Sequence, residues 1–102
     1  MDYSSVYLNE AKKIIDQLDT QIVESVVEHL VEIRRNEGRL FFIGVGGSAA
    51  NCAHAVNDFR KIVGIESYAP TDNVAELTAR TNDEGWETVF SEWLKISRLN
   101  SE

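Results

Sequence analysis

The sequence contains very little cysteine and no long apolar run, and both shortages limit what the protein can be. Cys52 is the only cysteine among the 102 residues, so no disulfide can form within the chain, and a reducing compartment is expected. No apolar stretch is long enough to cross a bilayer, and no charged and then apolar leader starts the sequence. We therefore expect a cytoplasmic protein without a membrane anchor.

Basic residues are scarce as well. The chain has 10 lysines and arginines against 17 aspartates and glutamates, which gives a formal net charge of -7. The basic residues are scattered, and this argues against nucleic acid as a partner, because binding phosphates needs clustered Lys and Arg. Apolar residues, in contrast, make up 43% of the sequence, which is enough for the core of one small domain.

The first third of the chain predicts two helices. Apolar residues recur at helical spacing over 7–18 and again over 22–33, with a break at "LDTQ" between them. Asp19 or Thr20 can cap the second helix, and Gly38 suits its C-terminal stop. The apolar stripe of the second helix is wide, so we expect it to pack on more than one neighbour, such as another subunit.

Two short strands are predicted after these helices. The continuous apolar run Leu40–Ile43 is typical of a strand that is buried on both faces, and such strands are usually parallel. The stretch 65–69 is a weaker strand candidate, closed by Pro70. Two strands make a very small sheet with two open edges. We therefore expect the front half of a larger domain, or a sheet that other chains complete.

Helices are expected around these strands. One should cover about 48–63, and a short one should follow Asn73, which has capping-box spacing with Glu76. A break is expected at Thr81–Asp83, before a last helix rich in aromatic residues. The order is helix, helix, strand, helix, strand, helix, helix. This order predicts an α/β fold, the start of a parallel Rossmann-like sheet with a right-handed crossover.

A glycine-rich loop joins the first predicted strand to the next helix. Gly44, Gly46 and Gly47 permit positive φ angles and the close approach of a ligand to the backbone. The helix behind them presents free N–H groups to an anion such as phosphate. The spacing lacks the third glycine of the dinucleotide fingerprint, where Ala49 stands, and the Lys-Ser/Thr pair of a Walker loop. A phosphate site is favoured over a plain turn, with Ser48 as helix cap or hydroxyl donor.

His54 and Asp58 are four residues apart on the helix that follows, so they share one face with Asn51. A histidine and a carboxylate at this spacing could supply two ligands to a zinc ion, or they could act as an acid–base pair. Two ligands are too few for a structural metal site. On the residues alone, an ordinary surface ion pair is therefore the favoured interpretation.

The stretch "FFIGVGGSAANCAHAVNDF" resembles the first motif of the sugar isomerase (SIS) domain, and more narrowly that of the phosphoheptose isomerases. The family has a strand, Gly-Asn-Gly-Gly-Ser, and then a helix with a histidine and, one turn later, a glutamate. Ser48, His54 and Asp58 keep these spacings. "LTARTNDEGWETVFSEWL" resembles a second segment, in which an Asn-Asp pair precedes an aromatic-rich helix, and Asn82 and Asp83 match this pair.

The resemblance covers nearly the whole chain but only the front half of the family's domain. It implies a single partial SIS domain over 1–102, with N-terminal helices in 1–38 and the first βαβ unit and later helices in 39–102. Family members use the two N-terminal helices in a tetramer, so a homo-oligomer is implied, either a dimer or a tetramer.

The resemblance also implies an aldose–ketose isomerase that acts on a sugar phosphate similar to sedoheptulose 7-phosphate, through an enediol. His54 and Asp58 would be the catalytic residues and ligands of zinc, with no tight zinc binding in this chain because the family's remaining ligands lie beyond the match. The residues implied to bind the substrate and its phosphate are Val45, Gly46, Gly47, Ser48, Asn82 and Asp83.

Two departures from the family pattern keep an alternative open. Val45 replaces an asparagine that contacts substrate, and Asp58 replaces a glutamate with a longer arm. Both changes favour a non-catalytic module that binds sugar phosphates and acts as a regulator or adaptor. The isomerase is the preferred interpretation for a complete domain, and no turnover is expected from these 102 residues alone.

Overall fold

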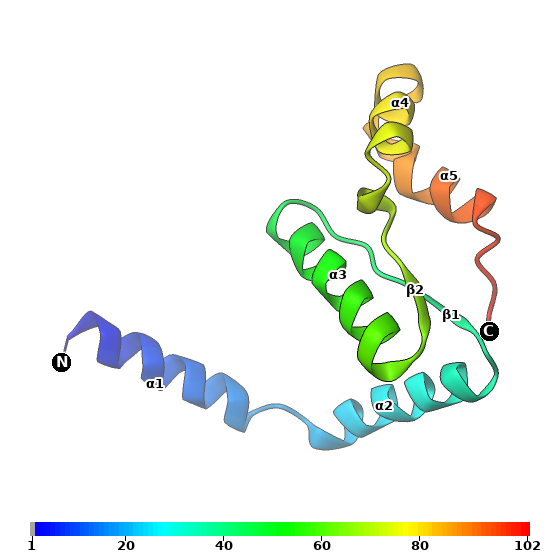
Figure 1. Ribbon diagram of the computed structural model, residues 1–102. Coiled ribbons are helices and arrows are strands. Elements are labelled where there is room, and N and C mark those ends of the chain that lie inside the picture. Colours follow the sequence, from blue (N-terminus) through cyan, green and yellow to red (C-terminus); the bar gives the residue numbers. More distant parts are fainter. Residues whose placement is uncertain (1) are drawn as a thin grey trace. The chain divides into compact units, whose positions relative to one another are not determined.

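The computed structural model describes residues 2–102 (Figure 1). The chain forms two compact units, one that ends at Leu30 and one that covers Val31–Glu102. Helix α1 (Tyr3–Asp16) and the larger part of α2 (Thr20–Arg35) form the first unit, and the sheet and the later helices form the second. Within residues 2–102, no helix combines the length and the apolar content that a bilayer crossing requires.

Both N-terminal helices start at aspartate caps. Asp2 accepts hydrogen bonds from the backbone N–H of Ser5 at 2.9 Å and from its hydroxyl at 3.0 Å, and these bonds lower the pKa of Asp2. Asp19, rather than Thr20, caps α2 by accepting the N–H of Gln21 at 2.9 Å. Neither helix has a buried residue, and most of their apolar side chains are exposed.

Helix α2 ends in a left-handed turn at Glu37, next to the glycine where the sequence predicted the stop. Glu37 has a φ of 55°. Gly38 N–H donates to the carbonyl of Ile33 at 2.8 Å and Glu37 N–H to that of Arg34 at 3.2 Å, which is the Schellman pattern. Gly38 instead leaves room for a neighbouring segment, because a Cβ there would collide with the backbone carbonyl of Glu102 and lie 3.2 Å from Ile33 Cγ2.

The second unit is built on a two-stranded parallel sheet. Strand β1 (Arg39–Phe41) pairs with β2 (Glu66–Tyr68), with Arg39 opposite Glu66. Helix α3 (Gly47–Asp58) makes the crossover, and a π-helical turn at Phe59–Val63 closes it (Figure 1). The parallel sheet and the crossover confirm the predicted fold class, although the single helix expected over 48–63 has two parts.

The two faces of this sheet differ in burial. On one face Phe42, directly after β1, packs against Phe59 at 5.3 Å between ring centroids. On the other face Glu66 and Tyr68 are exposed, and Arg39 Nε lies 4.0 Å from Glu66 Oε2. All three residues of β1 are half-buried, so the prediction of a strand buried on both faces is wrong for this chain.

The C-terminal helices follow a 3₁₀ turn at Pro70–Asp72. Asn73 caps α4 (Val74–Glu84) by accepting the N–H of Glu76 at 3.1 Å, as its capping-box spacing predicted. Helix α5 (Val89–Ile96) buries Val89 almost completely, at 1% exposure.

The break expected at Thr81–Asp83 is wrong, because α4 continues through these residues to Glu84. The hydroxyl of Thr81 donates to the carbonyl of Leu77 at 2.7 Å, one turn earlier, so this residue is accommodated within the helix. The helix ends instead at Gly85, whose φ is 93°.

The left-handed residue at the end of α2 generates a prediction about stability. Glu37→Gly should raise the free energy of unfolding by about 1 kcal/mol, because glycine adopts a positive φ without the steric cost of a Cβ. Glu37→Ala is the matched control, since alanine keeps the Cβ. Urea unfolding followed by circular dichroism measures both variants. An equal effect of the two substitutions would mean that the charge of Glu37, and not its backbone, controls stability here.

Candidate functional site

Two glycines make the turn from β1 into α3 possible. Gly44 is buried, and a Cβ on it would lie 2.6 Å from the backbone carbonyl of Ser48. Gly46 has a φ of 64°, in the left-handed region that favours glycine. The sequence thus places glycine at the two positions where this strand–helix turn requires it.

The hydroxyl of Ser48 stabilises the loop between β1 and α3 through two hydrogen bonds. Ser48 Oγ accepts a hydrogen bond from the N–H of Val45 and donates one to the carbonyl of Val45, both at 2.8 Å. Ser48 therefore does not cap α3, whose N-cap residue is Gly46 without any side-chain cap. The helix-cap alternative for Ser48 is wrong, and its role as a donor to phosphate stays a prediction.

The N-terminus of α3 presents free donors. The N–H of Ala50 donates to the carbonyl of Gly46 at 3.3 Å and makes the first hydrogen bond of the helix. The N–H groups of residues 47–49 come before this bond and have no acceptor within the helix. A Cβ on Gly47 would meet no atom within 4 Å, which means that open space lies beside this part of the loop. The helix dipole adds partial positive charge there, and an anion is the ligand that such an end favours.

His54 and Asp58 point toward each other on α3. His54 Nε2 lies 3.1 Å from Asp58 Oδ2, and the two side chains are 77% and 41% exposed. Asn57 Nδ2 donates to the second carboxylate oxygen of Asp58 at 3.3 Å. The surface pair that was favoured on the residues alone is thus present.

The donor set does not fit a zinc ion held by this chain alone. Among residues 2–102, no group of three or more His, Cys, Asp and Glu side chains could hold a metal. His54 and Asp58 supply two donors, whereas protein zinc sites use three or four. A zinc site at this pair would require ligands from outside the described residues.

Asn82 and Asp83 lie in the last turn of α4 and are exposed. Asn82 Nδ2 donates to Asp83 Oδ1 at 2.9 Å, so the two side chains are paired with each other. Within the described chain, no hydrogen bond joins them to the glycine loop, and their contact with substrate stays a prediction.

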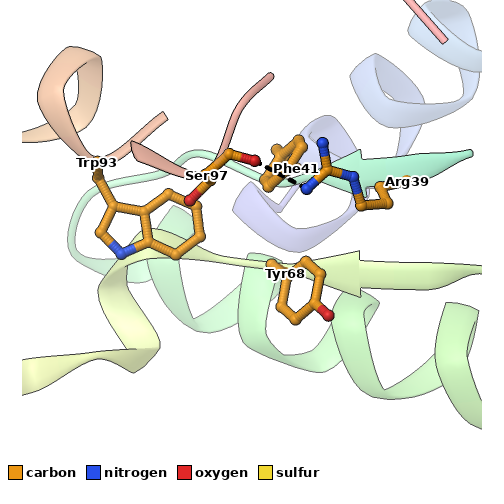
Figure 2. A pocket seen from close by; sticks show the side chains of 5 residues that line it. All are labelled: Arg39, Phe41, Tyr68, Trp93 and Ser97. Atoms are coloured by element: carbon orange, nitrogen blue, oxygen red, sulfur yellow. Dashed lines mark hydrogen bonds between the residues drawn. The ribbon is translucent and has the colours of Figure 1, made fainter. Parts of the chain in front are cut away.

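A cavity that the sequence analysis did not single out lies on the exposed face of the sheet. It has a volume of about 210 Å³ and is lined by Arg39, Phe41, Tyr68, Trp93 and Ser97 (Figure 2). The Arg39 guanidinium donates to the carbonyls of Ser97 and Arg98, both at 2.8 Å. These residues come from three separate segments, so no spacing in the sequence could have revealed the cavity.

Curated proteins of known family are similar to this chain in sequence. No protein-family model matches the chain. A phosphoheptose isomerase from Roseiflexus sp. (strain RS-1) is 32% identical over 87 residues, which is 80% of this chain and 44% of that protein. A phosphoheptose isomerase from Aneurinibacillus thermoaerophilus is 30% identical over 104 residues, which is 97% of this chain and 52% of that protein.

A solved structure gives the same result. The structure of phosphoheptose isomerase from Neisseria gonorrhoeae matches with a TM-score of 0.75 and 26% identity, over 91% of this chain and 52% of that chain. The chain therefore spans about half the length of the curated relatives it matches. These findings confirm the resemblance seen in the sequence: the chain is homologous to the phosphoheptose isomerases, proteins of the SIS type, and corresponds to about half of them.

Proposed function

We propose that this chain forms the sugar-phosphate-binding half of an aldose–ketose isomerase that acts on sedoheptulose 7-phosphate or a similar sugar phosphate. The observation that carries the proposal is the open space at Gly47, beside the uncapped N-terminus of α3. The homology to phosphoheptose isomerases supports the choice of substrate class.

The three glycines of the loop support a phosphate site because the fold requires only two of them. Gly44 is explained by its close approach to Ser48, and Gly46 is explained by its positive φ. Gly47 has neither constraint, because its φ is not positive and a Cβ would meet no atom within 4 Å. A phosphate bound at the free N–H groups would explain why this residue is a glycine, because a side chain there would occupy the space of the ligand.

The chemistry of the proposed reaction assigns roles to the polar face of α3. An aldose–ketose isomerisation removes a proton from the carbon next to the carbonyl and returns one to the neighbouring carbon, through an enediol. The Asp58 carboxylate is the candidate base, and His54 is the candidate partner that exchanges protons with the substrate oxygens. Both side chains are partly accessible to a ligand. Neither Asn82 nor Asp83 is needed for this step, and both are proposed only to contact the substrate.

A non-catalytic sugar-phosphate-binding module is the second candidate. The observation that favours it is the mutual pairing of His54 with Asp58 at 3.1 Å. In such a module the glycine loop would still bind phosphate, whereas the pair on α3 would be structural. For the 102-residue chain alone we expect binding without turnover.

We also propose that the chain assembles with copies of itself through the N-terminal helices. Single exposed apolar residues are ordinary, but two helices without one buried residue leave many apolar side chains in water. The exposed apolar side chains of α2 follow one stripe of the helix and are 42–64% accessible: Ile22, Val23, Val26, Val27 and Val31.

The glycine loop generates a prediction about ligand binding. Gly47→Ala should weaken the binding of sedoheptulose 7-phosphate at least about tenfold and leave the melting temperature unchanged, because the added methyl enters only the proposed ligand space. Titration followed by the NMR signals of the Gly47, Ser48 and Ala49 amides measures this binding. Unchanged affinity in Gly47→Ala would remove the central support for a phosphate site.

Gly44→Ala is the matched control for this experiment. Its methyl would lie 2.6 Å from the backbone of Ser48, so it should lower the melting temperature by several degrees whether or not a ligand is present. The two substitutions add the same atom three residues apart, which separates the effect on the ligand from the effect on the fold.

The polar pair generates a prediction that decides between the two candidate functions. The chain should be joined to the part of the Aneurinibacillus thermoaerophilus relative that lies outside the match, about half of that protein. In that chimera, Asp58→Asn should lower kcat for sedoheptulose 7-phosphate at least about a hundredfold with little change in the dissociation constant, since the amide cannot accept the proton. A chimera that binds the sugar phosphate and never turns it over supports the binding module instead.

The apolar stripe of α2 generates a prediction about assembly. Sedimentation equilibrium of the chain at micromolar concentration should give the mass of a dimer or tetramer. Val27→Glu should produce monomers, because it places a charge in the stripe. Gln21→Glu adds the same charge on the opposite side of the same helix and should leave the assembly intact. A monomeric parent chain contradicts the proposal.

A further inference from the structure

The turn that follows β2 lies at the same edge of the sheet as the glycine loop. Strands β1 and β2 are parallel, with Phe41 opposite Tyr68, so the chain leaves both strands in the same direction. Neighbouring strands are about 4.8 Å apart, and the two connections therefore start side by side. One connection is the glycine loop, and the other contains the 3₁₀ turn Pro70–Asp72 (Figure 1).

Packing holds this turn in place. Ala69 is 3% exposed, and Pro70 is fully buried. The N–H of Asp72 donates to the carbonyl of Ala69 at 3.0 Å, and the turn contacts α3 as well as α4 and α5. Helix α3 begins at this edge of the sheet and runs back toward the other edge. The turn therefore lies beside the end of α3 at which the phosphate site is proposed.

Asp72 is the acidic residue of this turn, and it is exposed. Among residues 2–102, no hydrogen bond or ion pair involves its carboxylate. The neighbouring Asn73 differs, because its side chain caps α4. The contacts of the described chain thus give the Asp72 carboxylate no structural role.

A carboxylate at this position has the chemistry to recognise a sugar. Its two oxygens can accept hydrogen bonds from two neighbouring hydroxyls, and hydrogen bonds to a charged acceptor are stronger than those to a neutral one. Parallel α/β proteins that bind dinucleotides use the same arrangement: a glycine loop after one strand binds phosphate, and an acidic side chain roughly 20 residues farther along binds sugar hydroxyls. Asp72 follows Gly47 at a comparable distance in the sequence.

We propose that Asp72 is a specificity-determining residue that binds two neighbouring hydroxyls of the sugar whose phosphate lies at the N–H groups of residues 47–49. This role depends on the proposed sugar-phosphate site and concerns the part of the ligand that the glycine loop does not bind. A loop that binds only phosphate accepts any phosphate ester, whereas the carboxylate favours esters that carry hydroxyls. The carboxylate also repels phosphate, so it disfavours a ligand bound in the reverse orientation.

Ligand titrations of the 102-residue chain test this role. The probes are sedoheptulose 7-phosphate, n-propyl phosphate and inorganic phosphate, and binding is followed by the NMR signals of the amides of residues 47–49. Asp72→Ala should weaken the binding of sedoheptulose 7-phosphate at least about tenfold, because hydrogen bonds to a charged group are lost. The affinities for n-propyl phosphate and inorganic phosphate should not fall, since neither carries a sugar hydroxyl.

Asp72→Asn and Asp16→Ala are the matched controls. Asparagine keeps one acceptor oxygen without the charge, so its affinity for sedoheptulose 7-phosphate should lie between those of the parent chain and Asp72→Ala. Asp16 is an exposed aspartate at the end of α1, and Asp16→Ala changes the net charge by the same amount. It should leave all three affinities unchanged. The melting temperatures of the Asp72 variants should equal that of the parent chain, because the carboxylate has no partner among residues 2–102.

The outcomes distinguish an error about Asp72 from an error about the phosphate site. If the parent chain and Asp72→Ala bind sedoheptulose 7-phosphate equally well, the role of Asp72 is wrong and the phosphate site stands. If Asp72→Ala weakens the binding of all three probes by the same factor, the carboxylate acts on the loop and not on the sugar, and its proposed role is again wrong. If the parent chain binds none of the probes, the phosphate site and the role of Asp72 are both wrong.

Discussion

The close approach of Gly44 to the backbone of Ser48 is the constraint on which the rest of the second unit depends. Because no Cβ intervenes, the chain turns from β1 directly into α3, and the start of the helix lies at the carboxyl end of the strand. The Ser48 hydroxyl then fixes the loop through both backbone groups of Val45. The free N–H groups and the polar face of α3 take their positions from this one turn.

The parts of the structure that could be predicted are those that neighbouring residues decide. The cap at Asn73 and the facing of His54 and Asp58 follow from helical spacing alone. The run Leu40–Ile43 and the glycines after it indicated a strand, a turn and a helix, and a match to half of a phosphoheptose isomerase structure confirms this architecture.

The predictions that were wrong concern contacts between distant segments, or a choice between neighbouring residues for the same role. The left-handed residue is Glu37 and not Gly38, at which a Cβ would meet the backbone of Glu102 and lie close to Ile33. Helix α4 passes through Thr81 because its hydroxyl bonds the previous turn, which sequence propensity does not reveal. The hydrogen bond of 3.2 Å that Arg60 Nη1 donates to the carbonyl of Ser67 in β2 depends on where a guanidinium points, which the sequence does not reveal. The sequence placed Asn82 and Asp83 in a break between helices, whereas they lie in the last turn of α4, and it could not place them beside a ligand.

Arg39 has a consequence for the order in which the second unit folds. Its guanidinium holds the carbonyls of Ser97 and Arg98, 58 and 59 residues later in the chain. Synthesis proceeds from the N-terminus, so β1 is made before Ser97 and Arg98. The Arg39 guanidinium can therefore form these two hydrogen bonds only after the last helix has been made. Closing a loop of this length carries an entropic cost that local helices do not pay. The hydrogen bonds of Arg39 with Ser97 and Arg98 therefore form late in folding. They attach the start of β1 to the end of α5.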